Sequence, residues 1–152
     1  MSDPWRTSAL CQLASIIVSA HRRHTGRDLV AADADALALA DALYATPQVV
    51  LAHDGASDPR YLYANRAAQA LWGYSWAEFI GMPSRLSAPP EGRQRRDGLL
   101  ATARATGVIH APDQVRVTRT GRLFRIAEVV LWNLDGVPGQ AATFDRWSFL
   151  DA

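Results

Sequence analysis

The sequence predicts a single α+β domain built on an antiparallel sheet, with an amphipathic helix at its N-terminus. Two short β-branched runs joined by turn residues precede three short helical stretches. Two apolar runs around a tight turn, and a further strand, follow these stretches. Hairpins on both sides of a helical insert imply an antiparallel sheet. A chain of 152 residues is long enough to form one such domain with its own core.

Composition and charge exclude several classes of protein. With 49% hydrophobic and 20% charged residues, the chain has the balance of an ordinary globular domain. A net charge of +1 gives no strong field toward nucleic acid or an anionic membrane. No run approaches the roughly 18 apolar residues of a membrane span. The single cysteine, Cys11, cannot form an internal disulfide and suits a reducing compartment. We therefore expect a cytoplasmic protein that binds neither nucleic acid nor membrane.

Residues 1–30 are predicted to hold an amphipathic helix that begins near Ser2 or Asp3, with Pro4 in its first position. The helix runs to about His24, and Gly26 is its natural end. One side carries apolar residues at three- and four-residue spacing, namely Leu10, Leu13, Ile16 and Ile17. We expect this side to pack on the rest of the domain or on a partner, and a homodimer is the expected assembly.

Residues 31–152 are predicted to form the main domain. It opens with a short helix, "DADALALADALYA", capped by Asp33 and closed before Thr46-Pro47, because the residue before a proline avoids helical angles. "QVVLAH" and "RYLYA" then predict strands near 47–53 and 60–64, and the turn-forming stretch "DGASDP" between them predicts a hairpin.

Three helices are expected next. "NRAAQALWG" reads as a helix capped by Asn65, and "SWAEFIG" as a second helix with a capping box made by Ser75 and Glu78. "EGRQRRDGLLATARATG" predicts a longer helix whose arginines, Arg96 among them, can lie toward water.

The final part of the chain predicts strands near 112–119, 122–132 and 139–147, the first two joined by a turn at Thr120-Gly121. Strict alternation in the middle strand sends Phe124, Ile126, Val130 and Trp132 to one side and Leu123, Ala127, Val129 and Leu131 to the other. A strand apolar on both sides is buried on both sides. The short helices can cover one face of the sheet, and the N-terminal helix can cover the other.

This order of elements resembles the PAS superfamily, in which short helices lie on one face of a five-stranded antiparallel sheet. Three segments more closely resemble the MEKHLA-domain family: "YANRAAQALWGYSWAEFIGMPSRLSA", "TGRLFRIAEVVLWNL" and "GQAATFDRW". The resemblance runs from about residue 33 to 149. It implies a PAS-like sensory or regulatory module, and it does not imply a set of catalytic residues.

The cofactor is unknown, and the sequence argues against two that PAS domains use. Light-sensing flavin domains carry a cysteine where this chain has "GMPSRLSAPP", so a flavin adduct is not expected. Haem needs an axial ligand. The histidine near the expected position, His110, stands beside a proline loop, where a solvated side chain is the usual case, so haem is not expected. His21 and His24 could share a metal ion, but Arg22 and Arg23 between them argue against a cation, so no metal is expected.

Aromatic residues and one arginine suggest the ligand site. Trp72 and Trp132 could line a pocket between the helices and the sheet, with apolar walls and a few polar anchors. Arg85, on a proline-bounded loop, could bind a carboxylate or phosphate at its mouth. Tyr63 begins the segment "YANRAAQALWGYSWAEFIGMPSRLSA", which also contains Trp72 and Arg85, and it is included in the expected ligand site. The alternative is that the rings fill the core and that Arg85 ties loop carbonyls together.

Glu128 is the remaining candidate. If alternation holds, it shares a strand face with Trp132, and a carboxylate there must be paired, raised in pKa or placed at a cavity. Arg116 and Arg125 are its possible partners, because the turn at Thr120-Gly121 allows two registers. Arg116 and Glu128 are therefore included among the ligand-binding residues, with a purely structural ion pair as the alternative.

These observations support three functional hypotheses. The first is a stand-alone, non-catalytic sensory module that binds a small organic molecule or a partner protein. The second is a small enzyme that uses Glu128 and an arginine as acid–base and anion-binding groups. The third is a structural dimerisation domain with a filled interior.

Overall fold

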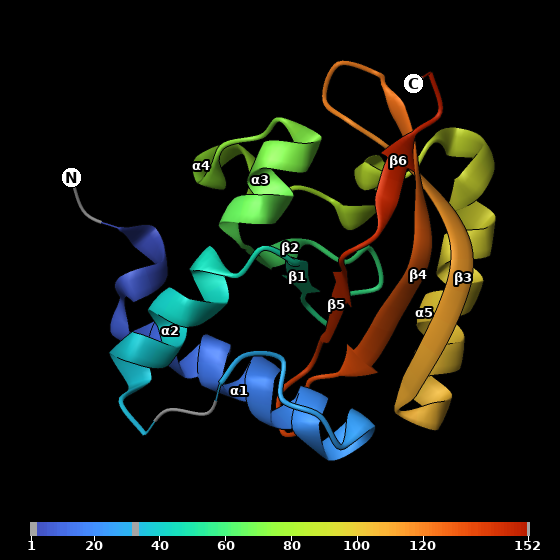
Figure 1. Cartoon of the computed structure of the whole chain (residues 1–152). Coiled ribbons are helices and arrows are strands. Elements are labelled where there is room, and N and C mark those ends of the chain that lie inside the picture. The colour runs from blue at the N-terminus through green and yellow to red at the C-terminus, as the bar shows by residue number, and fades with distance from the viewer. Residues whose placement is uncertain (1–2, 32–33, 152) are drawn as a thin grey trace.

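The computed structural model describes residues 3–31 and 34–151. An antiparallel sheet forms its centre (Figure 1). The strand order is β2-β1-β5-β4-β3, and β6 pairs with β4 beyond the end of β5. The six strands are β1 (Val49–His53), β2 (Tyr61–Ala64), β3 (Val108–Val117), β4 (Leu123–Asn133), β5 (Gln140–Phe144) and β6 (Trp147–Phe149). The predicted α+β class and the antiparallel pairing are confirmed.

The sequence predicts five strands, and the structure has six because the last one is interrupted. The expected strand 139–147 stops at Phe144 and resumes at Trp147, and both parts pair with β4. Strand β3 begins at Val108, four residues before its predicted start at 112. The sheet is otherwise the one expected.

The N-terminal helix begins later than predicted. Pro4–Arg6 form a separate turn, η1, and α1 (Ser8–Thr25) starts after Thr7, whose side-chain oxygen accepts a hydrogen bond from the backbone N–H of Leu10. Gly26 ends α1 in the left-handed conformation, as expected. The other proposed start, Ser2, lies outside the described residues. Within the described part of the chain, no helix is both long and apolar enough to cross a membrane.

Helix α2 (Ala36–Ala45) is capped by Asp35, whose Oδ1 accepts from the N–H of Leu37 at 3.1 Å. Asp33, the predicted cap, lies outside the described residues. Further along are α3 (Arg66–Trp72), α4 (Trp76–Phe79), the turns η2 (Ser84–Ser87) and η3 (Pro90–Gly92), and α5 (Arg93–Thr106). The predicted capping box of Ser75 and Glu78 is present at the start of α4.

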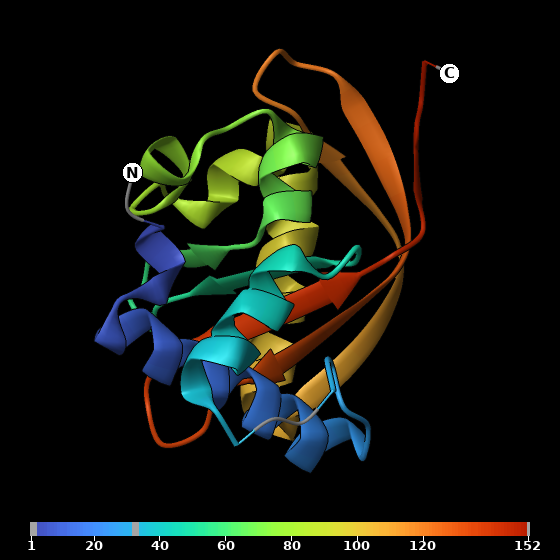
Figure 2. The same cartoon turned by 60° about the vertical axis from the view of Figure 1, so that its left-hand side comes forward.

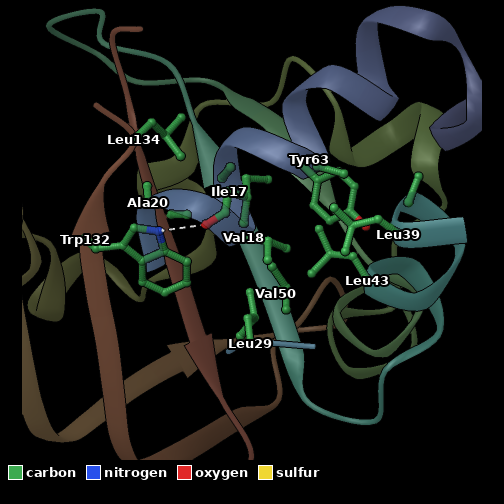
Figure 3. Packing of buried hydrophobic residues seen from close by; sticks show 14 of the residues in the cluster. Ile17, Val18, Ala20, Leu29, Leu39, Leu43, Val50, Tyr63, Trp132 and Leu134 are labelled. Carbon is green, nitrogen blue, oxygen red and sulfur yellow. Dashed lines mark hydrogen bonds between the residues drawn. The ribbon is translucent and has the colours of Figure 1, made fainter. Parts of the chain in front are cut away.

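Helices cover both faces of the sheet (Figure 2). On the first face, α1 and α2 pack over β1 and β4, with Ile17, Leu43 and Val50 in the contact (Figure 3). Trp132 lies on this face, and its Nε1 donates to the carbonyl oxygen of Ile17 at 3.3 Å. The apolar side of α1 therefore packs on the domain itself, while the expected homodimer stays a prediction.

The opposite face is covered by α3, α4 and α5. Trp72 packs against Phe79 and Phe124 there, and Leu100 and Ala103 of α5 pack against Leu131. The candidate site lies in this second core.

Two breaks in strand alternation decide which side chains reach which face. In β2, Tyr63 pairs with Ala52, but Tyr61 pairs with the adjacent His53, so Leu62 forms a bulge. Tyr61 consequently joins the second core, whereas Tyr63 joins the first. Two residues that strict alternation would place together therefore lie on opposite sides of the sheet.

The second break in alternation affects the paired strands β3 and β4. Ile126 and Val129 both lie in the second core although they are three positions apart, so alternation fails between them. On the paired strand, Asp113 adopts a positive φ of 57° where alternation fails as well. Glu128 falls at this irregularity and is exposed.

Asn65 joins four elements at the end of the first hairpin. It is fully buried, and its Oδ1 accepts from the N–H groups of Val50 (3.0 Å) and Ala68 (3.1 Å). Its Nδ2 donates to the carbonyl oxygens of Gln48 (2.8 Å) and Leu43 (3.3 Å). The predicted helix cap is confirmed, and the same amide also ties α2 and β1 to α3.

We expect Asn65→Ala to lower the free energy of unfolding by about 2–5 kcal/mol, since it removes a helix cap and leaves buried N–H groups unpaired. Urea denaturation measures the change. Ser75→Ala, which removes an exposed cap, is the matched control and should cost only about 1 kcal/mol. Equal losses in the two variants would contradict the role given to Asn65.

Candidate functional site

A small, partly open cavity of about 60 Å³ lies between the sheet and the helices of the second core. Its wall is mostly apolar and is made by Leu51, Trp72, Leu99, Leu100, Ile109, Ile126, Val129, Leu131, Ala142 and Phe144. Five polar side chains complete it: His53, Tyr61, Ser87, Arg96 and Arg116. Apolar walls with a few polar groups are typical of small-molecule sites.

Trp72 forms part of this wall and is also packed. It is 1% exposed, and its ring meets those of Phe124 and Phe144 edge to face, with centroids 5.1 and 6.0 Å apart. Its Nε1 lies 3.5 Å from the carbonyl oxygen of Ser87. Trp72 therefore lines a cavity and also holds the second core together, while its role in ligand binding stays a prediction.

The turn η2 contributes serines to the site. The hydroxyl of Tyr61 donates to Oγ of Ser87 at 2.9 Å, and Oγ of Ser87 donates to the carbonyl oxygen of Ser84 at 2.8 Å. These three residues are buried, so the network fixes the turn against β2. Both hydroxyl hydrogens are used within the network and are not available to a ligand.

Arg96 is a site residue that sequence analysis placed in water. It is only 5% exposed, and it donates to Oγ of Ser84 and to Oδ1 of Asp97. The sequence does carry a signal for this position, because Arg96 recurs at helical spacing with the apolar residues Leu100 and Ala103. The structure buries all three side chains. An arginine on the apolar side of a helix needs a polar neighbour or a cavity, and here it has both.

Arg116 reaches the cavity from β3. Its Nη1 donates to the carbonyl oxygen of Val115 at 2.8 Å. Among the described residues, no carboxylate pairs with it. Burial lowers the pKa of Arg116 to about 10; the nearby Tyr61 raises it, and Arg96 lowers it further. Arg116 therefore lines the cavity, and its role in ligand binding stays a prediction, while its candidate partner Glu128 is absent from this side.

His53 stands at one end of the cavity. Its Nδ1–H donates to the carbonyl oxygen of Asp54 at 2.9 Å, and its buried Nε2 has no hydrogen-bond partner among the described residues. Burial lowers the pKa of His53 to about 4, so the ring is neutral at pH 7. His53 also lines an open cleft of about 630 Å³, shared with Arg104 and Gln140. It therefore lies between the cavity and the surface.

Two expected site residues lie on the other face of the sheet. Trp132 is fully buried beneath α1, and Tyr63 lies beside Leu39 and Leu43 of α2 (Figure 3). The bulge at Leu62 moves Tyr63 to that face, and burial raises the pKa of its hydroxyl. The expectation that Trp72 and Trp132 border one cavity is wrong, because the sheet separates them.

Arg85 and Glu128 are exposed at the surface. Nε of Arg85 lies 3.2 Å from Oδ1 of Asp58, outside the cavity, because η2 buries Ser84 and Ser87 and directs Arg85 outward. Glu128 meets neither Arg116 nor Arg125, the two partners considered from the sequence. Its Oε1 lies 3.6 Å from Nδ1 of His110.

The fold is that of a PAS domain. A PAS domain from Colwellia psychrerythraea superposes with a TM-score of 0.61 at 17% identity, over 70% of this chain and 92% of that one. The LOV domain of the blue-light activated histidine kinase from Erythrobacter litoralis EL346 gives 0.53 at 15% identity, over 69% and 97%. The PAS domain of a LuxR-family transcriptional regulator from Burkholderia thailandensis, in complex with ethanol, gives 0.57 at 20% identity, over 74% and 96%.

The sequence identifies one family within this fold class. The profile of the MEKHLA domain matches residues 11–149, and the chain belongs to that family. The match includes most of α1, so the N-terminal helix is part of the family's domain. No curated protein matches the sequence.

The neutral state of His53 makes stability depend on pH. In the unfolded chain its pKa is near the ordinary 6.5, so between pH 6.5 and about 4 the unfolded state binds one proton more than the folded state. The free energy of unfolding should therefore fall as pH is lowered through this range, by up to about 1.4 kcal/mol per pH unit from this residue. Urea denaturation of the wild type and of His53→Gln across the range isolates the contribution. Identical slopes in the two proteins would contradict it.

Proposed function

We propose that this protein is a non-catalytic sensory module that binds a small organic molecule in the cavity of its PAS-like fold. The observation that carries the proposal is the cavity itself, an apolar space with convergent polar side chains inside a domain of this size. Membership of the MEKHLA family and the PAS-like fold support a sensory role.

The size of the cavity favours a very small ligand. Its volume of about 60 Å³ is far below the roughly 300–1,000 Å³ of sites for drug-sized molecules. Roughly 10–15 Å³ of such cavity space holds one water molecule, so the space suits a few non-hydrogen atoms and not a flavin ring system. The Burkholderia thailandensis domain was solved with ethanol, a molecule of this size.

The geometry favours binding over catalysis. Among the described residues, no carboxylate lines the cavity. Glu128, the acid–base group of the enzyme hypothesis, lies at the surface beside His110. The polar groups that remain are two guanidiniums, a neutral imidazole and two hydroxyls bonded to the protein. This set can orient a ligand, whereas proton transfer at neutral pH would need a group that titrates there.

Filling the cavity should abolish binding. We expect Ala142→Leu, on the cavity wall, to weaken binding at least tenfold, because its side chain takes the space of the ligand. NMR titration with a panel of alcohols, amides, amines and carboxylates of up to six non-hydrogen atoms measures this. Ala127→Leu, at an exposed position of β4, is the matched control and should bind as the wild type does. Failure of the entire panel to bind the wild type would overturn the proposed function.

A further inference from the structure

We propose that the ligand of this cavity is a short-chain carboxylate whose oxygens are held by the guanidiniums of Arg96 and Arg116. This inference rests on the proposed function and adds the chemical class of the ligand.

The charged side chains of the cavity wall are both positive. Arg96 and Arg116 bring two positive charges to a wall that contains no carboxylate among the described residues. The acidic contact of Arg96 is with Asp97, whose side chain is 68% exposed, and Arg116 has none within residues 3–31 and 34–151. A desolvated charge without a close counter-charge is unfavourable, and a bound anion would supply the counter-charge that Arg116 lacks.

The hydrogen-bond donors of the site point to the same ligand class. A guanidinium has five N–H donors. Arg96 uses donors on Ser84 and Asp97, and Arg116 uses one on the carbonyl oxygen of Val115. The hydroxyls of Tyr61 and Ser87 already donate within the protein. The donors that remain are therefore guanidinium N–H groups, whose geometry matches the two oxygens of a carboxylate.

The rest of the wall selects an anion with a hydrocarbon part. Ten of the fifteen lining residues are apolar, among them Leu51, Ile109 and Leu131. Inorganic phosphate or sulfate would leave this surface without a partner, while a methyl or ethyl group would fill it. The volume limits the chain to a few carbons.

Propionate and propionamide test the inference on the wild-type protein. They have the same number of non-hydrogen atoms and differ in charge. We expect NMR titration at constant ionic strength to give a dissociation constant at least tenfold lower for propionate, with sodium phosphate binding more weakly than propionate.

Arg116→Met supplies the residue-level test. It keeps an apolar stem and removes the guanidinium, so propionate binding should weaken at least tenfold while propionamide binding stays within about twofold. Without added ligand its melting temperature should equal or exceed that of the wild type, because a desolvated charge is removed. Arg85→Met, at the exposed arginine paired with Asp58, is the matched control and should leave propionate binding unchanged.

The possible failures are distinguishable. Propionamide or phosphate binding as tightly as propionate would overturn the carboxylate inference and leave the proposed function standing. Absence of binding by every small molecule tested would overturn both. The ligand comparison on the wild type decides the question even if Arg116→Met does not fold.

Discussion

The buried apolar side chains of the central sheet are divided between two cores, because helices cover both faces of the sheet. The assignment of residues to cores is not set by alternation alone. A bulge at Leu62 sends Tyr61 and Tyr63 to opposite faces. The irregularity around Asp113 and Glu128 interrupts the alternation of side chains in the β3–β4 hairpin. The composition of the cavity follows from these two breaks, since they bring Tyr61 and Arg116 to one side and leave Glu128 outside.

The sequence predicted the features that depend on local chemistry. The order of elements, the caps at Asn65 and Ser75 and the end of α1 at Gly26 follow from residues close together in the chain. The site was predicted less well. The choice of Glu128 depended on strict alternation, which fails where Glu128 stands, and the bulge at Leu62 turns Tyr63 to the other face. Such breaks depend on strand pairing that no short sequence pattern encodes. Arg96 is different, since its helical spacing with Leu100 and Ala103 could have revealed it.

The fold alone does not define the ligand, because one fold serves many functions. The chemistry of the cavity is the more specific guide, because two guanidiniums from α5 and β3 line it together with apolar side chains. The serine and tyrosine network holds η2 in place and leaves the guanidiniums as the available donors. A small anion with a hydrocarbon part satisfies the charge, the donors and the apolar surface together.

The most direct measurement is the side-chain NMR spectrum of the arginines during a titration with propionate. The account predicts that the Nε–Hε signals of Arg96 and Arg116 shift and that their exchange with water slows, while the signal of exposed Arg85 does not change. Assignment follows from the signals lost when each arginine is replaced by lysine. Shifts confined to exposed arginines, or no shift at saturating propionate, would contradict the account.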